Sequence, residues 1–218
     1  MKLKTIRSGV LLGAVISLAF VGQAVAQNAP ASHVHIGHAA DGWRDTPDGV
    51  GLLPAAVAEA AVAQTHAGLA AGSSGLDGIK RHIGHVVHAI DPTVRESGPG
   101  NGYGVVKGAS GAATHIGLAA RSEGASGNVT THGNHVGTSL ENVQQWASEI
   151  LALAARVNRT SDASMAADLA GQIHQLTQSI VEGHDANGDD RIGWQSGEGG
   201  LAQATLHLSL LKRGEGID

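Results

Sequence analysis

An internal repeat constrains the fold of this chain more than any other feature of its sequence. Residues 65–91 and 114–142 both open with Thr-His-x-Gly-Leu-Ala-Ala, and each copy then carries a His-x-x-His pair. The repeat relates three histidines of the first copy to three of the second: His66 to His115, His82 to His132 and His85 to His135. Repeated segments of this length usually form one supersecondary unit each, and the units pack on one another. We therefore predict two related structural units.

The pattern of apolar residues and breaks predicts helices in both units. Stretches rich in Ala, Leu and Val suit helices, whereas Gly-Ser and Asp-Pro segments end them. The expected helices cover residues 52–71, 76–90, 105–121, 128–158, 162–183 and 198–212. No stretch alternates with period two, so we expect an all-α fold. We predict duplicated helical hairpins that form a four-helix bundle, followed by an EF-hand-like helical pair.

The N-terminal residues have the features of a secretory signal peptide. A basic start with Lys2, Lys4 and Arg7 precedes an apolar run, and Ala24-Val25-Ala26 fits a cleavage site. We predict export to the periplasm or out of the cell, with an uncleaved membrane anchor as the alternative. The predicted organisation is a signal peptide at 1–26, a His-containing strap at 27–51, the His-rich bundle at 52–160 and the helical pair at 161–218.

Composition excludes several classes of function. The chain has no Cys, so disulfides, thiolate metal sites and thiol catalysis are excluded. Its 3 Trp, 1 Tyr and 1 Phe argue against aromatic platforms for single-stranded nucleic acid. A net charge of −5 argues against binding to the phosphate backbone. The 13 histidines are the strongest indication of function.

The positions of the repeated histidines predict metal sites. The break at residues 72–75 lies midway between His66 and His82, so a helical hairpin would place both at the same height. Neighbouring helix axes lie about 8–10 Å apart, a gap that two imidazoles can bridge. His85 follows His82 by three residues and shares its helix face. The predicted ligand sets are His66, His82 and His85 in one hairpin, and His115, His132 and His135 in the other.

Three functions are compatible with these histidine sets. Neutral imidazoles suit zinc, copper, nickel or iron, which indicates binding, storage or delivery of a transition metal ion. Three imidazoles with an open position also suit a metal-dependent enzyme, but no Glu or Asp recurs beside them, so an enzyme is less favoured. The glycines that follow His66 and His115 by two residues indicate close approach to the backbone, which would also suit haem b between two histidines.

The remaining histidines are assigned by their surroundings. His35 and His38 lie in the predicted strap, where either could be an additional cofactor ligand or part of a surface tail. His174, His184 and His207 follow no repeat, and we expect them at the surface or in helix interfaces. The repeated histidines, too, could be satisfied within a helical interface without binding an ion. The expected partners are metal ions and another exported protein.

A segment near the C-terminus resembles the start of an EF-hand calcium loop. Residues 185–198 place oxygen-bearing side chains at the first, third and fifth positions, with Ile192 at the eighth. The resemblance implies calcium ligands at Asp185, Asn187, Asp189, the carbonyl of Arg191 and Glu198. Two positions depart from the motif, because Asp190 replaces the usual glycine and Ser196 the usual bidentate glutamate. Asp tolerates the required left-handed backbone better than most residues.

Overall fold

The described part of the chain is helical throughout. A computed structural model describes residues 29–217 and contains seven α-helices, one short 3-10 helix and no strand in that range. The helices are α1 (Ala31–Ala40), α2 (Leu52–Ala71), α3 (Leu76–Ile90), α4 (Val105–Arg121), α5 (Gly127–Arg159), α6 (Ala163–Val181) and α7 (Leu201–Glu215), with the 3-10 helix η1 at Pro47–Gly49. The predicted all-α class is confirmed. The predicted signal peptide lies outside the described residues.

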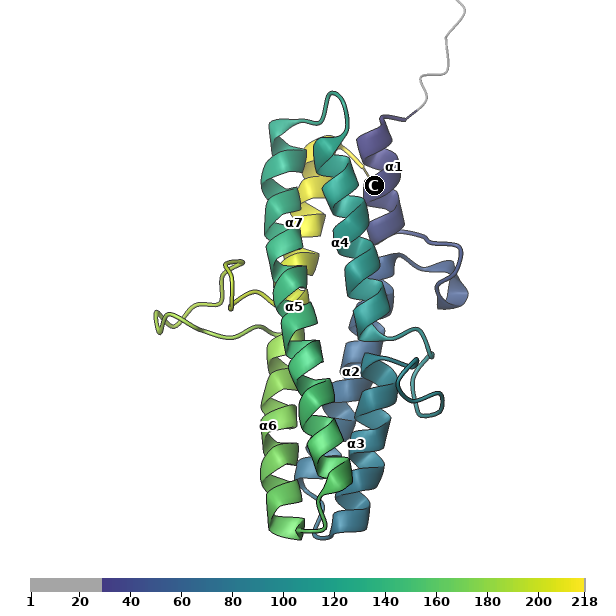
Figure 1. Ribbon diagram of the computed structural model, residues 1–218. Helices are drawn as coiled ribbons and strands as arrows, with labels where there is room; N and C mark the ends of the chain where they lie inside the picture. The colour runs from purple at the N-terminus through teal and green to yellow at the C-terminus, as the bar shows by residue number, and fades with distance from the viewer. Residues whose placement is uncertain (1–28, 218) are drawn as a thin grey trace, which may run out of the picture.

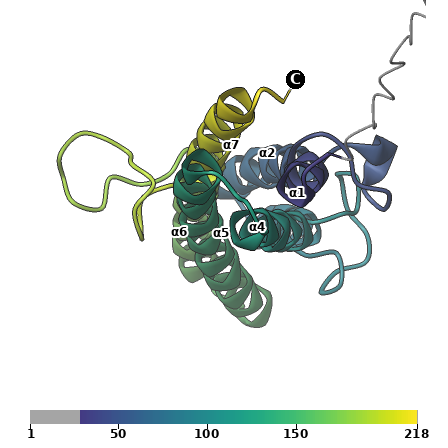
Figure 2. The same cartoon turned by 90° about the horizontal axis from the view of Figure 1, so that it is seen from above.

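The elongated shape of the molecule follows from one long helix. α5 spans 33 residues and runs the full length of the bundle (Figure 1). α1, α4 and α7 lie at the level of its N-terminal half, whereas α2, α3 and α6 lie at the level of its C-terminal half (Figure 1). Seen from above, the helices group closely and the 182–200 loop projects from one side (Figure 2).

The C-terminal helices are part of this bundle and do not form a separate pair. α6 packs against α2 and α5, and α7 packs mainly against α5. α7 lies above α6 along α5, so the two helices follow each other instead of packing side by side (Figure 1). This arrangement differs from the predicted EF-hand-like pair. The predicted strap differs as well, because residues 31–40 form α1, which packs on α4.

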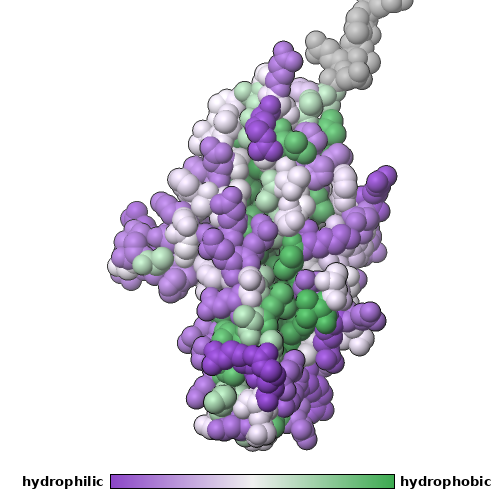
Figure 3. Space-filling view, viewed as in Figure 1, coloured by the Kyte–Doolittle hydropathy of each residue, from purple (hydrophilic) through white to green (hydrophobic). Residues whose placement is uncertain are grey.

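Small residues bring the helices close together. The core is built largely from Ala, Val, Ile and Leu, with Ala56, Ala67 and Ala109 fully buried. A Cβ on Gly108 of α4 would lie 2.9 Å from the Cβ of Ala56 on α2, so glycine is needed where these helices meet. Apolar residues fill the seam between helices on the face shown in Figure 3, and hydrophilic residues cover most of the rest.

A buried carboxylate fixes the connection between α3 and α4. Glu59 of α2 is 0% exposed, and its Oε1 accepts hydrogen bonds from the backbone N–H groups of Asn101 (3.1 Å), Tyr103 (2.8 Å) and Gly104 (3.4 Å). The other carboxylate oxygen is buried without a hydrogen-bond partner. Glu59 therefore holds the Gly-rich 98–104 segment against the bundle, a role that its place in an apolar helix does not predict.

Candidate metal centres

Nine of the histidines gather in three groups of three. In each group one ring nitrogen per histidine lies within 4.8 Å of the other two. We name the groups triad 1 (His35, His38 and His115), triad 2 (His66, His82 and His85) and triad 3 (His132, His135 and His207). Each triad could hold a metal ion.

All three triads are built in the same way. One helix supplies two histidines three residues apart, which share a face, and a neighbouring helix supplies a single histidine. The paired histidines lie on α1, α3 and α5, and the single histidines lie on α4, α2 and α7 respectively. The single histidine is always at the centre, because both members of the pair direct a nitrogen at it.

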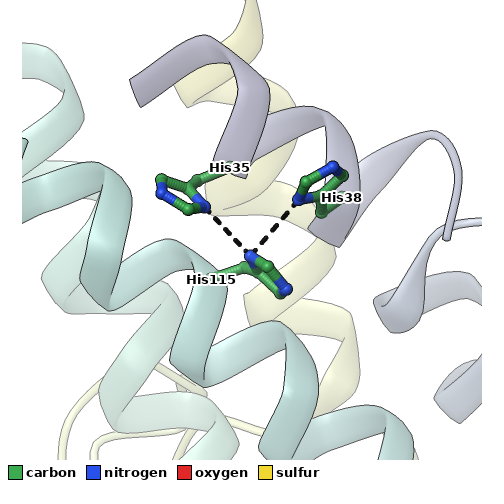
Figure 4. A group of neighbouring side chains, drawn as sticks. All are labelled: His35, His38 and His115. Atoms are coloured by element: carbon green, nitrogen blue, oxygen red, sulfur yellow. Dashed lines mark hydrogen bonds between the residues drawn. The ribbon is translucent and has the colours of Figure 1, made fainter. Parts of the chain in front are cut away.

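Triad 1 is formed by α1 and α4 (Figure 4). The Nδ1 of His115 lies 3.1 Å from the Nδ1 of His35 and 3.4 Å from the Nδ1 of His38. The three rings point toward a common centre between the two helices (Figure 4).

The other two triads repeat these distances closely. In triad 2, the Nδ1 of His66 lies 3.2 Å from that of His82 and 3.3 Å from that of His85. In triad 3, the Nδ1 of His207 lies 3.0 Å from that of His132 and 3.3 Å from that of His135. The same atom of the ring is used every time.

These separations match those of imidazoles around one small ion. With metal–nitrogen bonds of 2.0–2.1 Å, ligands at the tetrahedral angle are about 3.3 Å apart, and ligands on opposite sides of an ion are about 4.1 Å apart. Each imidazole nitrogen carries either one lone pair or one N–H, so in the absence of an ion the central nitrogen of a triad can form a full hydrogen bond with only one of its two neighbours. A bound ion would satisfy all three nitrogens with metal–nitrogen bonds.

The donor sets consist of histidine alone. No Asp or Glu belongs to any of the metal-compatible groups found in residues 29–217. Every member of the triads is half-buried, so each centre is reachable from solvent on one side. Three protein ligands with an accessible further position characterise open metal sites, whereas closed structural sites have four.

The surroundings keep several of these imidazoles neutral. Burial lowers the pKa of His66, His85, His115 and His135 below the usual 6.5, and the neighbouring imidazoles of the same triad lower it further. Burial, followed by the proximity of His135 and His132, lowers the pKa of His207 to about 4. Because only a neutral imidazole can coordinate a metal, these shifts extend the pH range in which ligands are available.

The structure brings together one predicted ligand set and divides the other. His66, His82 and His85 meet across the α2–α3 hairpin, as the repeat predicts. His115 does not meet His132 and His135, although α4 and α5 are neighbours. His115 joins the two histidines of the predicted strap, so His35 and His38 lie in a triad of their own.

Packing between α4 and α5 explains the incorrect grouping. A Cβ on Gly133 of α5 would lie 3.5 Å from Ala120 and from Ile116 of α4. The apolar residues at 116 and 120 therefore face α5, and His115, one position away from Ile116, faces α1. The repeat preserves the positions of the histidines in the sequence but not the helix that each one faces.

His207 is the ligand that the sequence prediction missed. It was expected at the surface or in an interface because it lies outside the repeat, and it is the central histidine of triad 3. One signal is present in the sequence, because three separate segments carry His-x-x-His, at 35/38, 82/85 (which continues to His88) and 132/135, and each pair requires a single partner. The repeat supplies two of the partners, His66 and His115, and the third, His207, lies outside it.

The glycines near the histidines are approached by side chains of the protein itself. A Cβ on Gly84 would lie 2.8 Å from the guanidinium carbon of Arg95, and one on Gly117 would lie 3.1 Å from the guanidinium of Arg121. A Cβ on Gly68 would lie 3.5 Å from the Nε2 of His174. The predicted close approach to the backbone is therefore accounted for at these positions without a porphyrin.

The 185–198 loop shares one backbone feature with a calcium loop, but Asp185, Asp189 and Glu198 do not form one of the metal-compatible groups in the described residues. Asp190 has the left-handed φ of 62° that the motif requires at its position. The carboxylate of Asp185 accepts hydrogen bonds from the N–H groups of Gly188 (2.8 Å) and Asp190 (2.9 Å). The buried Glu198 accepts from the Asn187 side chain at 2.7 Å and from the N–H of Gly193 at 3.0 Å. Calcium binding stays a prediction.

Comparisons with protein-family models, curated proteins and solved structures found no match. Among the described residues, no helix combines the length and apolar character needed to cross a membrane. The class of site is therefore defined by its own geometry, as a set of three-histidine metal-compatible centres in a helical bundle.

Proposed function

We propose that this protein binds transition metal ions, one at each triad, and that it stores or delivers them outside the cytoplasm. The observation that carries the proposal is that, in three separate places, two Nδ1 atoms lie 3.0–3.4 Å from the Nδ1 of a central histidine. A hydrogen-bonded cluster of neutral histidines could arise once. Three clusters with the same donor set and the same atoms indicate selection for a common ligand.

Storage or delivery is favoured by the accessibility of the triads. Each centre is half-buried and supplies three neutral donors, so an ion has a further position open for exchange with water or a partner protein. Imidazole donors suit zinc, copper, nickel and iron. A metal-dependent enzyme is less favoured, because the triads contain no carboxylate that could act as a general base.

The separations between the Nδ1 atoms favour a single metal ion over haem b. Two histidines on opposite faces of a porphyrin iron need nitrogens about 4.1 Å apart with the macrocycle between them. In each triad, the Nδ1 of the central histidine lies only 3.0–3.4 Å from the Nδ1 atoms of its two neighbours. A single ion fits this spacing better.

Metal binding is tested by counting ions. Apo-protein prepared with a chelator is dialysed separately against Zn(II), Cu(II) and Ni(II) and then analysed for its elements. We expect three equivalents of at least one of these metals per chain, and none at the triads of the variant His66→Ala/His115→Ala/His207→Ala. Equal metal content in the two proteins would overturn the proposal. A Soret band after incubation with haemin, absent from the variant, would favour the haem alternative.

Export is proposed from the predicted signal peptide at residues 1–26. Cell fractionation followed by N-terminal sequencing tests it. We expect the protein in the periplasmic or extracellular fraction with Gln27 at its N-terminus, whereas a full-length chain in the cytosol would contradict export.

A further inference from the structure

Two of the three triads have an indole ring against their imidazoles. Trp194 stacks on His135 of triad 3, with ring centroids 3.9 Å apart and planes inclined by 15°. Trp43 lies beside triad 1, with its ring centroid 4.8 Å from those of both His38 and His115. Both tryptophans come from loops that carry no histidine of the triads.

The loop that carries Trp43 is fixed by its own hydrogen bonds. The backbone N–H of Trp43 donates to the carbonyl of Val50 at 3.0 Å. The backbone carbonyl of Trp43 accepts from the hydroxyl of the buried Thr46 at 2.7 Å. Trp43 also packs partly buried against the hydrophobic core. The backbone beside triad 1 therefore has little freedom to move the indole away.

The loop that carries Trp194 is anchored to α5 by Asn142. This side chain is 1% exposed and lies two helical turns after His135. Its Nδ2 donates to the carbonyls of Gln195 (2.9 Å) and Gly199 (3.0 Å), and its Oδ1 accepts from the N–H of Gly197 (2.8 Å). The same helix thus holds two ligands of triad 3 and the anchor of the loop that packs on one of them.

Triad 2 has a different neighbour. In the described part of the chain, only the rings of the triad itself pair with His66, His82 or His85. The guanidinium of Arg95 lies against Gly84, the residue between His82 and His85 on α3. Arg95 is exposed, so solvent screens its repulsion of a bound dication, and the main difference of triad 2 is that no indole in the described part of the chain packs on it.

We propose that Trp43 and Trp194 are positioning residues that hold the imidazoles of triads 1 and 3 in their ion-binding orientation. The three sites then fall into two kinds, two supported by an indole and one, triad 2, that binds more weakly. Packing against a rigid aromatic ring restricts the imidazole before the ion arrives, so less conformational entropy is lost on binding. This inference rests on the proposed function, because it concerns the same three sites.

The test isolates one site of each kind. The variant His66→Ala/His115→Ala retains triad 3, and His115→Ala/His207→Ala retains triad 2. Each is titrated with Co(II), whose visible absorption is intense only in four-coordinate geometry, against a competing chelator. We expect one Co(II) in each background, with tighter binding and the more intense spectrum at triad 3.

Substitutions at tryptophan then test the positioning role in the triad 3 background. We expect Trp194→Leu to weaken Co(II) binding by about 10–100-fold and to reduce the absorption, as losses of partners outside the ligand shell do. Trp194→Phe keeps an aromatic ring and should retain most of the affinity. Trp146→Leu is the matched control, because Trp146 lines a groove between α5 and α6 with Leu176 and Glu182.

The outcomes separate the two proposals. Binding of one Co(II) with equal affinity and spectrum in the parent, Trp194→Leu and Trp146→Leu proteins would overturn the positioning role and leave metal binding intact. Absence of Co(II) from both single-triad backgrounds would overturn metal binding itself. If Trp194→Leu fails to fold, as judged by circular dichroism, Trp194→Phe and Trp43→Leu in a triad 1 background (His66→Ala/His207→Ala) decide the question.

Discussion

The Nδ1 atoms of His35 and His115 lie 3.1 Å apart, although 80 residues separate them in the chain. The contact joins α1 to α4 and places His115 in a triad with the N-terminal histidines. His132 and His135 correspondingly find their partner at His207, on the last helix. Which histidines could share an ion is therefore decided by contacts between helices that are distant in sequence.

Ion counts in double variants distinguish this grouping from the hairpin grouping. His35→Ala/His207→Ala removes one ligand from triad 1 and one from triad 3, so we expect the number of bound ions to fall from three to one. If His115, His132 and His135 shared an ion, that variant would keep two. His174→Ala/His184→Ala is the control, and elemental analysis should still find three ions in it.

The free energy of unfolding of the apo-protein should fall as the pH is lowered from about 6.5 toward 4. The folded-state pKa of His207 is lowered from 6.5 to about 4, so in this range the unfolded chain binds protons that the folded chain does not. Urea unfolding followed by circular dichroism at several pH values between 7 and 5 measures the effect. This range lies above the usual pKa of 4.5 of a glutamate such as Glu215, so carboxylates contribute little.

His207→Gln provides the control for the pH experiment. It removes the histidine with the largest shift, so its stability should depend less steeply on pH than that of the parent. An equally steep dependence in the two proteins would contradict the assignment of the effect to His207.

Replacing Glu59 should destabilise the fold without affecting metal binding directly. Glu59→Ala leaves the N–H groups of Asn101, Tyr103 and Gly104 without their acceptor, and Tyr103 and Gly104 are buried. Buried N–H groups without an acceptor predict a decrease on the order of 3 kcal/mol in the free energy of unfolding. Glu141→Ala, an exposed position on α5, is the control and should change stability by less than about 0.5 kcal/mol. Similar stabilities of the two variants would argue against the anchoring role.

Calcium binding by the 185–198 loop is tested by calorimetric titration of the metal-free protein. We expect the parent to bind one Ca²⁺ and the variant Asp185→Ala/Asp189→Ala to bind none, because two of the four predicted side-chain ligands are removed. Glu123→Ala/Glu149→Ala lowers the charge equally and is the control. No calcium-dependent heat in the parent at millimolar concentrations would refute the prediction.

The helices after residue 51 could be predicted closely, because strong local signals bound them. Gly-Ser breaks separate α2 from α3 at residues 72–75, and Asp91-Pro92 follows the end of α3. α1 was missed because its sequence, ASHVHIGHAA, combines Ser, Gly and three His with little apolar periodicity. That helix is stabilised by packing against α4, which no local pattern reports.

The sequence predicts that the candidate sites are groups of three histidines, but it predicts only partly which histidines meet in each group. The His-x-x-His spacing fixes which pairs share a helix face, and triad 2 follows from the α2–α3 hairpin. Triads 1 and 3 depend on helix faces that are set by Gly133, Ile116 and Ala120, whose small and branched side chains form the α4–α5 seam. The number of residues between two histidines does not indicate which neighbouring helix each of them faces.

The positions of the triads would give ions bound there a mechanical role in a chain that has no cysteine. Triad 1 closes a loop of 80 residues and triad 3 one of 75, whereas triad 2 closes one of 16. Ions at the two long-range positions would restrict the unfolded chain as covalent staples do, and the entropic gain grows with the size of the loop. Release of the ions from triads 1 and 3 would then loosen α1 and α7 at one end of the bundle. The resistance of the protein to unfolding and proteolysis would therefore depend on how many ions it holds.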